Sequence, residues 1–315
     1  MNRKAIIFGI KSYKLSRKEK IFFKKIEPWG IILFSRNIKN ISQLKNLVSE
    51  IKIFFNDKNY PILIDQEGGR VSRLNKILDL SFFTQEYFGK LFKKDRKTFL
   101  INYKIYINTV SDILNEVGIN INTVPVLDVK RKNSNNIIGD RSFSENPLIV
   151  KKLGEICVKS FMSNKIATVI KHIPGHGLSK TDSHLQTPTV RAKKKELLRK
   201  DFLPFKKQKS LFSMTAHIIY SAFDKNNTAT HSSVVIKKII RNNINYKGII
   251  ISDDISMKAL KYKIEDNAIK AINSGCNLVL HCNANLGEMH KLAKVIPRID
   301  KFTEKKTSQF YKFLM

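Results

Sequence analysis

One short part of the sequence concentrates side chains that can transfer protons. An apolar run that begins at Ala167 leads into a glycine- and proline-rich segment that carries His172, His176, Asp182 and His184. In an extended segment, side chains two residues apart point the same way, so Asp182 and His184 can face one ligand together. A carboxylate beside an imidazole fixes its tautomer and favours its protonated form. The spacing therefore predicts an acid–base centre.

Carboxylates elsewhere in the chain can serve the same chemistry. The segment GIIISDDIS ends in Asp253 and Asp254, and alternation along a strand directs the two side chains to opposite sides. We expect Asp253 to act as a nucleophile or to stabilise a cation, and Asp254 to cap the helix that follows. The segment PILI leads into Asp65, which can bind sugar hydroxyl groups or pair with Arg70 or Arg73.

A regular alternation of segments, expected to be strands and helices, must position these side chains. Short apolar runs, each expected to be a strand, begin at Ala5, Gly30, Pro61, Ile121, Ala167, Leu211, Gly248 and Asn277. Longer segments with helical spacing lie at residues 16–27, 41–57, 95–117, 147–164, 192–208, 232–245 and 258–274, and from 286 onward. Eight strand–helix pairs predict a (β/α)8 TIM-type barrel, with residues 1–315 as one catalytic domain.

The positions of polar residues favour this barrel over a doubly wound open sheet. Different apolar runs end at or just before Asp65, Asp128, His172, His217 and Asp253. In a barrel, the C-terminal ends of all strands meet at one mouth. We therefore expect these side chains to share one pocket.

The composition excludes several classes of protein. Hydrophobic residues make up 42% of the chain, which excludes disorder, and no apolar run approaches the roughly twenty residues that span a bilayer. The three cysteines, Cys157, Cys276 and Cys282, form no CxxC pair, and an odd number suits a reducing compartment. We expect a soluble, cytoplasmic monomer that does not associate with a membrane.

The chain is strongly basic, with 58 Lys and Arg against 26 Asp and Glu and a net charge of +32. Such an excess is typical of nucleic-acid-binding proteins. Here the lysines are spread over nearly every amphipathic segment, and the runs at 193–195 and 305–306 are short. We interpret the charge as solvated helix surfaces and expect no specific nucleic-acid partner. A non-enzymatic nucleic-acid-binding protein remains an alternative, and it predicts salt-dependent binding to DNA or RNA.

Four segments in this order resemble the β-N-acetylglucosaminidases of glycoside hydrolase family 3: IDQEGGRVSRL, GDRSFS, KHIPGHG followed by DSH, and ISDDISM. The resemblance covers nearly the whole chain and is to the single-domain bacterial enzymes of peptidoglycan recycling. It implies a retaining exo-enzyme that removes terminal N-acetylglucosamine from 1,6-anhydro-N-acetylmuramic acid and its peptide-bearing forms. It also implies that the enzyme needs no metal and no organic cofactor.

The resemblance further implies roles for individual residues. Asp253 would be the nucleophile, and His184 the general acid/base, assisted by Asp182. The residues that bind the terminal sugar would be Asp65, Arg73, Arg141, Lys171 and His172. The sequence departs from the family at Ile173, where Phe is more usual, and no reactive group is lost there.

Two other enzymatic functions remain open. A glycoside phosphorylase would use the same site with phosphate as the acceptor, because a neutral histidine repels an anion less than a carboxylate does. A metal-dependent barrel hydrolase would bind its ion through His172, His176 and an aspartate. Pro174 and Gly175 oppose this arrangement, because they prevent the helix that would direct both imidazoles to one ion.

Overall fold

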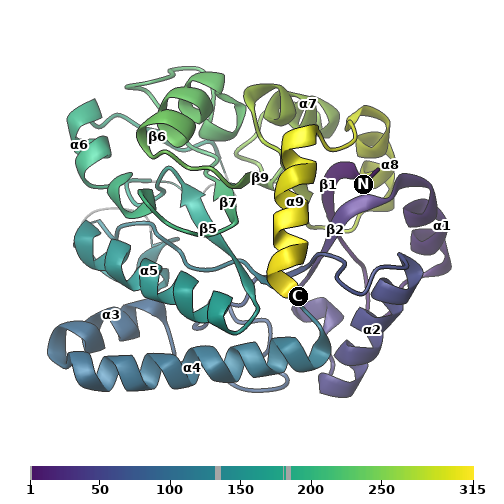
Figure 1. The fold of residues 1–315 in the computed structure, drawn as a ribbon. Coiled ribbons are helices and arrows are strands. Elements are labelled where there is room, and N and C mark those ends of the chain that lie inside the picture. Colours follow the sequence, from purple (N-terminus) through teal and green to yellow (C-terminus); the bar gives the residue numbers. More distant parts are fainter. Residues whose placement is uncertain (1, 132–135, 180, 182–185) are drawn as a thin grey trace.

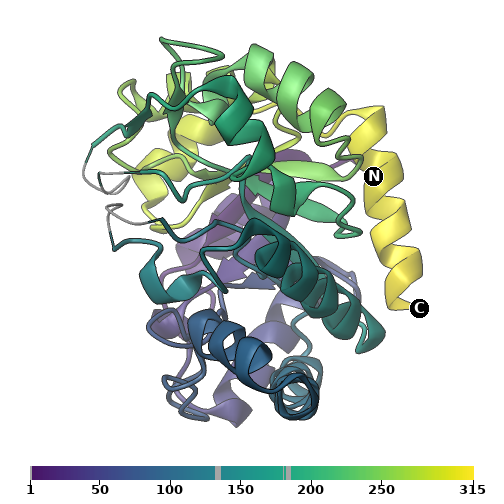
Figure 2. The same cartoon turned by 90° about the vertical axis from the view of Figure 1, so that its left-hand side faces the viewer.

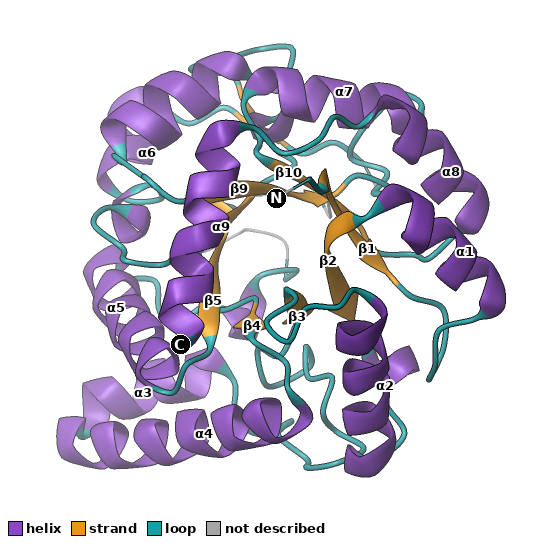
Figure 3. Cartoon of the chain, turned by 45° about the vertical axis from the view of Figure 1, so that its right-hand side comes forward, coloured by secondary structure: helices purple, strands orange, loops and turns teal. Residues whose placement is uncertain are grey.

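The computed structural model describes residues 2–131, 136–179, 181 and 186–315. Its parallel strands close into a barrel in the order β1-β10-β9-β7-β5-β4-β3-β2 (Figure 3). The strands are β1 (Lys4–Gly9), β2 (Pro28–Leu33), β3 (Ile62–Ile64), β4 (Ile121–Asn122), β5 (Ala167–Ile173), β7 (Phe212–Thr215), β9 (Ile249–Asp254) and β10 (Leu278–His281). The predicted (β/α)8 barrel is confirmed, and the doubly wound open sheet is excluded.

Helices surround the barrel (Figure 1). They are α1 (Arg17–Ile26), α2 (Ile41–Phe54), α3 (Gln85–Lys94), α4 (Arg96–Val117), α5 (Pro147–Ser163), α6 (Lys194–Arg199), a π-helix (Val235–Asn243), α7 (Ile264–Ser274), α8 (Leu286–Val295) and α9 (Lys301–Leu314). Several begin where a polar side chain caps the first turn, as Ser16 does for α1 and Asp95 for α4. None of the helices in the described ranges is both long and apolar enough to cross a membrane.

The helices differ from the predicted segments in four places, the first of which is α3, because no predicted segment covers it. Segment 192–208 forms only α6 and a 3-10 turn at Leu203–Phe205, because Pro204 interrupts helical hydrogen bonding. The C-terminal segment forms two helices, α8 and α9, with Pro297 between them. Segment 258–274 becomes helical only at Ile264.

The barrel is closed by apolar side chains at the end from which its strands start. There α9 lies across the strands (Figure 2). Its Phe310 packs against Phe212 and Trp29, with ring centroids 5.4 and 6.4 Å apart. The indole of the buried Trp29 donates a hydrogen bond to Thr307 Oγ1 at 2.9 Å. This closure leaves the C-terminal ends of the strands as the end that can hold a polar site.

Candidate active site

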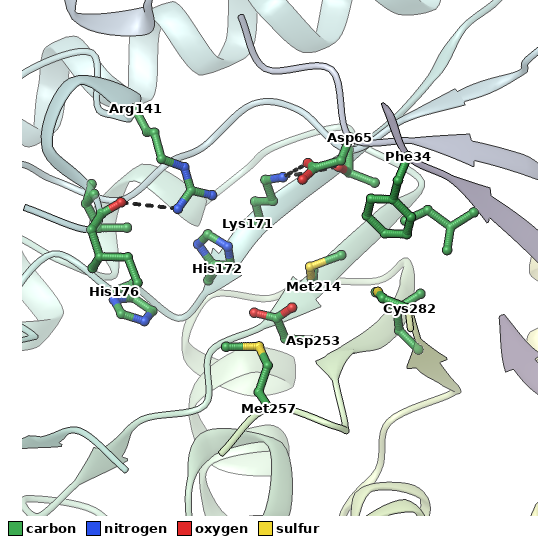
Figure 4. Close-up of a pocket in the computed structure, with 15 residues that line it drawn as sticks. Phe34, Asp65, Arg141, Lys171, His172, His176, Met214, Asp253, Met257 and Cys282 are labelled. Carbon is green, nitrogen blue, oxygen red and sulfur yellow. Dashed lines mark hydrogen bonds and ion pairs between the residues drawn. The ribbon is translucent and has the colours of Figure 1, made fainter. Parts of the chain in front are cut away.

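A pocket opens at the C-terminal ends of the barrel strands and contains about 570 Å³ of empty space, part of it open to solvent (Figure 4). It is lined by Ile32, Phe34, Asp65, Thr123, Ile137, Ile138, Arg141, Lys171, His172, His176, Met214, Asp253, Met257, Leu280 and Cys282. Contributions come from strands on opposite sides of the barrel. The pocket therefore exists only because the barrel is closed.

The structure brings together most of the side chains predicted at the strand ends. Asp65 follows β3, His172 lies in β5 and Asp253 lies in β9, and all three line the pocket. Asp128 and His217 do not line it. Both are buried beside it, where Asp128 contacts His172 and the ring of His217 lies 3.0 Å from the carbonyl oxygen of Asp254.

One side of the pocket is formed by a chain of alternating charges. Arg73 Nη2 lies 2.9 Å from Asp65 Oδ2, and Lys171 Nζ pairs with the other oxygen of Asp65. Lys171 Nζ also lies 2.6 Å from Glu67 Oε1. Arg141 then binds both oxygens of Glu67, at 2.7 Å each. Because the signs alternate along this chain, every charge has an opposite charge next to it.

The same contacts decide which groups are ionised. Burial alone would raise the pKa of Asp65, but the Lys171 and Arg73 charges hold it well below its usual range. Glu67 shows the same balance, because Arg141 and Lys171 lower its pKa in spite of burial. Burial would lower the pKa of Lys171, yet Asp65 and Glu67 raise it. At neutral pH the chain of charges is therefore fully ionised.

Asp128 fixes the position of two histidines. Its Oδ2 lies 2.7 Å from His172 Nδ1, and its Oδ1 accepts hydrogen bonds from the backbone N–H groups of His172 at 3.2 Å and His176 at 2.6 Å. The carboxylate accepts the Nδ1 proton of His172, which leaves Nε2 of that ring for a ligand in the pocket. Burial and the neighbouring His172 lower the pKa of His176 to about 4, so His176 is neutral at physiological pH.

Asp253 presents a carboxylate on the other side of the pocket, across from the charged chain (Figure 4). Its Oδ1 accepts a hydrogen bond from the N–H of Asp254 at 2.8 Å. Burial alone would raise the pKa of Asp253, but His172, His217, the Asp254 N–H and Lys171 lower it. An ionised carboxylate at this position can attack an electrophilic carbon or stabilise a positive charge on it.

The prediction that Asp254 caps the following helix is wrong. Helix α7 begins at Ile264, and Lys263, which precedes it, makes no side-chain cap. The carboxylate of Asp254 instead accepts hydrogen bonds from the N–H of Ser256 at 3.1 Å and its hydroxyl at 2.9 Å, and from the N–H of Cys282 at 3.3 Å. Asp254 thus stabilises the turn after β9 and connects it to the end of β10.

The structure also decides between the two arginines expected near Asp65. Arg73 makes the pair, whereas Arg70 pairs with Asp140 at 3.0 Å. Arg73 does not line the pocket but contacts two residues that do: it pairs with Asp65, and its Cζ lies 5.5 Å from the ring centroid of Phe34.

Sequence reasoning missed Glu67 and the apolar lining. Glu67 is buried between two cations, and a signal was available, because in an extended segment it would point the same way as Asp65. The side chains of Phe34, Met214 and Met257 carried no comparable signal in the sequence.

The predicted acid–base pair, Asp182 and His184, lies outside the described residues. Within the described ranges, no group of three His, Cys, Asp or Glu side chains is arranged to hold a metal ion. His172 and His176, the imidazoles considered as metal ligands, have ring centroids 5.6 Å apart, and His172 Nδ1 is engaged by Asp128.

The charged chain is expected to make stability depend on pH in the acid range. The pKa of Asp65 is lower in the folded protein than in the unfolded chain, where it is about 3.9. Its contribution is therefore fully present above about pH 5 and is lost as the pH falls below about 4. We expect the difference in unfolding free energy between the wild type and Asp65→Asn to be largest at pH 7 and to shrink below pH 4. Denaturant titrations at several pH values measure it, and a difference that does not change with pH would contradict the assignment.

Comparisons with known proteins agree with the barrel and its pocket. The family model described as the Glycosyl hydrolase family 3 N terminal domain matches residues 5–309. Beta-hexosaminidase from Actinobacillus pleuropneumoniae serotype 5b (strain L20) is 33% identical over 293 residues, which are 91% of this chain and 83% of that protein.

Solved structures are similar over the whole chain. Native NagZ from Neisseria gonorrhoeae has a TM-score of 0.88 and 30% identity, and the match covers 100% of this chain and 90% of that chain. NagZ from the same organism in complex with N-trifluoroacetyl-D-glucosamine has a TM-score of 0.86 and 29% identity, with the same coverage.

Proposed function

Because this chain belongs to glycosyl hydrolase family 3 and is a glycoside hydrolase of the β-N-acetylhexosaminidase type, we propose that it is a retaining exo-enzyme that cleaves muropeptides. It removes non-reducing terminal N-acetylglucosamine from 1,6-anhydro-N-acetylmuramic acid, with or without an attached peptide. The observation that carries this proposal is the position of Asp253. An ionised carboxylate faces a polar pocket wall that can bind the hydroxyl groups of a sugar.

The terminal sugar is recognised by Asp65, Arg73, Arg141, Lys171 and His172. Asp65 accepts hydrogen bonds from hydroxyl groups, and His172 meets the sugar through Nε2 because Asp128 holds Nδ1. Arg141 uses Nε and Nη2 to bind Glu67 and Nη1 to reach the carbonyl oxygen of Ile137 at 3.3 Å, which leaves further N–H groups for the ligand. Arg73 acts through Asp65, to which it is paired.

In the first chemical step, a carboxylate oxygen of Asp253 attacks the anomeric carbon. A covalent bond forms between that oxygen and the sugar, and the bond from the anomeric carbon to the leaving oxygen breaks. His184 donates a proton to that leaving oxygen and becomes neutral, and the Asp182 carboxylate stabilises the protonated imidazole that is needed before this transfer. The depressed pKa of Asp253 favours this step, because the nucleophile must be ionised at neutral pH.

In the second step, water releases the sugar. His184, now neutral, accepts a proton from the water molecule, whose oxygen attacks the anomeric carbon as the bond to Asp253 breaks. The two displacements occur at opposite faces of the sugar, so the product keeps the β configuration. The free carboxylate and the protonated imidazole are both restored.

This activity places the protein in the recycling of peptidoglycan in the cytoplasm, where it acts as a monomer on a small carbohydrate. Its substrate carries N-acetylglucosamine at the non-reducing end, and its products are N-acetylglucosamine and the anhydro sugar. No specific nucleic-acid partner and no membrane are needed for this reaction.

The proposal is tested with purified N-acetylglucosaminyl-1,6-anhydro-N-acetylmuramic acid, with and without its peptide, in buffers that contain or lack phosphate. We expect free N-acetylglucosamine from both substrates, at a rate that does not depend on phosphate, as measured by mass spectrometry. N-acetylglucosamine 1-phosphate, formed only when phosphate is present, would identify a phosphorylase instead. Release from neither substrate, combined with activity on an aryl N-acetyl-β-glucosaminide, would show that the natural substrate is a different glycoside.

A further inference from the structure

Glu67 is a buried carboxylate that does not line the pocket but binds two side chains that do. Its side chain is 2% exposed. Oε1 lies 2.6 Å from Lys171 Nζ and 2.7 Å from Arg141 Nη2, and Oε2 lies 2.7 Å from Arg141 Nε. Both carboxylate oxygens are therefore occupied by groups that come from two distant parts of the chain.

We propose that Glu67 is a positioning residue that holds Lys171 and Arg141 at the spacing needed to bind the terminal sugar. This inference rests on the proposed function, because it takes those two cations as sugar-binding groups. Glu67 touches neither the sugar nor Asp253. Its effect on the reaction passes through its two partners.

Arg141 depends on Glu67 because its own segment gives it little support. It lies in a short 3-10 turn, Gly139–Arg141, rather than in a barrel strand. Apart from Glu67, the described residues offer its guanidinium a hydrogen bond to the carbonyl oxygen of Ile137 at 3.3 Å. Pairing of two N–H groups with one carboxylate fixes the plane of a guanidinium as well as its distance. Glu67 therefore sets the direction in which the free N–H groups of Arg141 point.

Lys171 depends on Glu67 for a different reason. Its ammonium group has three N–H donors, and within the protein it contacts Asp65, Glu67 and, at 3.1 Å, Thr123 Oγ1. Thr123 Oγ1 in turn donates to Asp65 Oδ1 at 2.6 Å, so these two partners lie side by side, and Glu67 is the second carboxylate that holds the ammonium.

The backbone of Glu67 is fixed by contacts within the protein. Its N–H donates to the carbonyl oxygen of Val71 at 2.9 Å, and its carbonyl oxygen accepts from the hydroxyl of Tyr106 at 3.2 Å. The following Gly68 has φ of +90°, and a Cβ atom there would lie 2.3 Å from the carbonyl oxygen of Phe83. The turn is therefore closely packed, and Glu67 is in place before a sugar binds.

Removal of the Glu67 charge should also change how Lys171 titrates. The charged groups that face Lys171 are Asp65 and Glu67, which raise its pKa, and Arg141, which lowers it, while Asp253 lies farther away across the pocket. Without Glu67, burial and Arg141 are opposed by fewer negative charges. The pKa of Lys171 then falls, and the ammonium is lost at a lower pH.

The experiment compares Glu67→Gln and Glu67→Asp with the wild type on 2,4-dinitrophenyl N-acetyl-β-glucosaminide between pH 6 and 11. Its leaving group needs no proton from His184, so the alkaline limb of kcat/KM does not report that imidazole. The carbonyl oxygen of Gln can replace Oε1, but its NH2 group then faces the Nε–H of Arg141, a donor against a donor, and the negative charge is lost. We therefore expect KM to rise by about 10- to 100-fold, a larger change than that in kcat. The alkaline limb of kcat/KM should also move to lower pH. Glu67→Asp keeps the charge but is one methylene shorter. It should raise KM and leave the alkaline limb near that of the wild type.

Asp57→Asn serves as the matched control. Asp57 pairs with Arg3 at 2.6 Å and accepts from Tyr311 at 2.6 Å, close to α9 and away from the pocket. It should lower the melting temperature without changing KM or the alkaline limb. A purely structural role for Glu67 predicts that its variants behave like this control.

The outcomes separate the two proposals. If the wild type cleaves no N-acetyl-β-glucosaminide, the proposed function fails. If the wild type is active and folded Glu67→Gln keeps both the wild-type KM and the wild-type alkaline limb, the positioning role fails. If Glu67→Gln does not fold, Glu67→Asp decides alone, because an unchanged KM in that variant contradicts the proposal.

Discussion

Asp253→Asn is expected to lower kcat for an aryl N-acetyl-β-glucosaminide by about 10⁴-fold or more, because the amide cannot form the covalent intermediate. The substitution keeps the shape of the side chain and removes its charge. The chromophore released by purified enzyme measures the loss, and the circular dichroism spectrum of the variant checks its fold. Asp253 carries this expectation because its carboxylate lines the pocket and is ionised at neutral pH.

The neighbouring carboxylate provides a matched control. In Asp254→Asn the side chain still accepts from the backbone N–H groups of Ser256 and Cys282 through its remaining oxygen. The hydroxyl of Ser256 can reverse its hydrogen bond and accept from the new amide. We therefore expect kcat to fall by less than about tenfold. Equal losses in the two variants, or more than a tenth of wild-type activity in Asp253→Asn, would rule out Asp253 as the nucleophile.

Sodium azide separates the two roles that the sequence left open for Asp253. In Asp253→Ala the space vacated by the carboxylate admits a small anion. If Asp253 is the nucleophile, azide attacks the anomeric carbon from that face, the aryl oxide leaves, and the product is the α-glycosyl azide. If Asp253 only stabilises positive charge, added azide yields no α-azide.

The barrel could be predicted from the sequence because its strands are buried on both faces. Such strands appear as continuous apolar runs, and each predicted run contains or overlaps a barrel strand. Helix α3 was missed although the sequence carries a signal for it, since Thr84 caps its first turn; the reason for the glycine within it is what the sequence does not contain. The helix is short and includes Gly89, where a Cβ atom would lie 1.7 Å from the carbonyl oxygen of Phe143. The need for glycine there arises from packing between segments, which local periodicity does not record.

The site was predicted to the extent that barrel geometry determines it. Asp65, His172 and Asp253 could be assigned to one pocket because each lies at the C-terminal end of a strand. The same rule could not show that the Asp128 carboxylate would contact Nδ1 of His172, or that Glu67 would pair with two cations, Lys171 and Arg141. Such pairs depend on side-chain distances between segments that are far apart in the sequence.

His184→Ala is expected to slow cleavage of the natural disaccharide by about 10²- to 10⁴-fold, the usual contribution of a general acid. The leaving sugar oxygen is strongly basic and must be protonated as the bond breaks. A 2,4-dinitrophenyl leaving group needs no proton, so bond cleavage in that substrate should be much less affected. Hydrolysis of the covalent intermediate still lacks its base, and the aryl substrate should therefore give a rapid burst of chromophore followed by slow turnover.

Azide gives this variant a signature opposite to that of Asp253→Ala. It attacks the intermediate from the face opposite Asp253, needs no general base, and yields the β-glycosyl azide with faster steady-state turnover. His290→Ala is the control, because His290 is exposed on α8 and packs on Phe22 with ring centroids 4.8 Å apart, away from the pocket. Its kinetics should match those of the wild type on both substrates. Equal losses on the disaccharide and the dinitrophenyl glycoside in His184→Ala, with no burst, would exclude His184 as the acid, since only a group that protonates the leaving oxygen distinguishes the two.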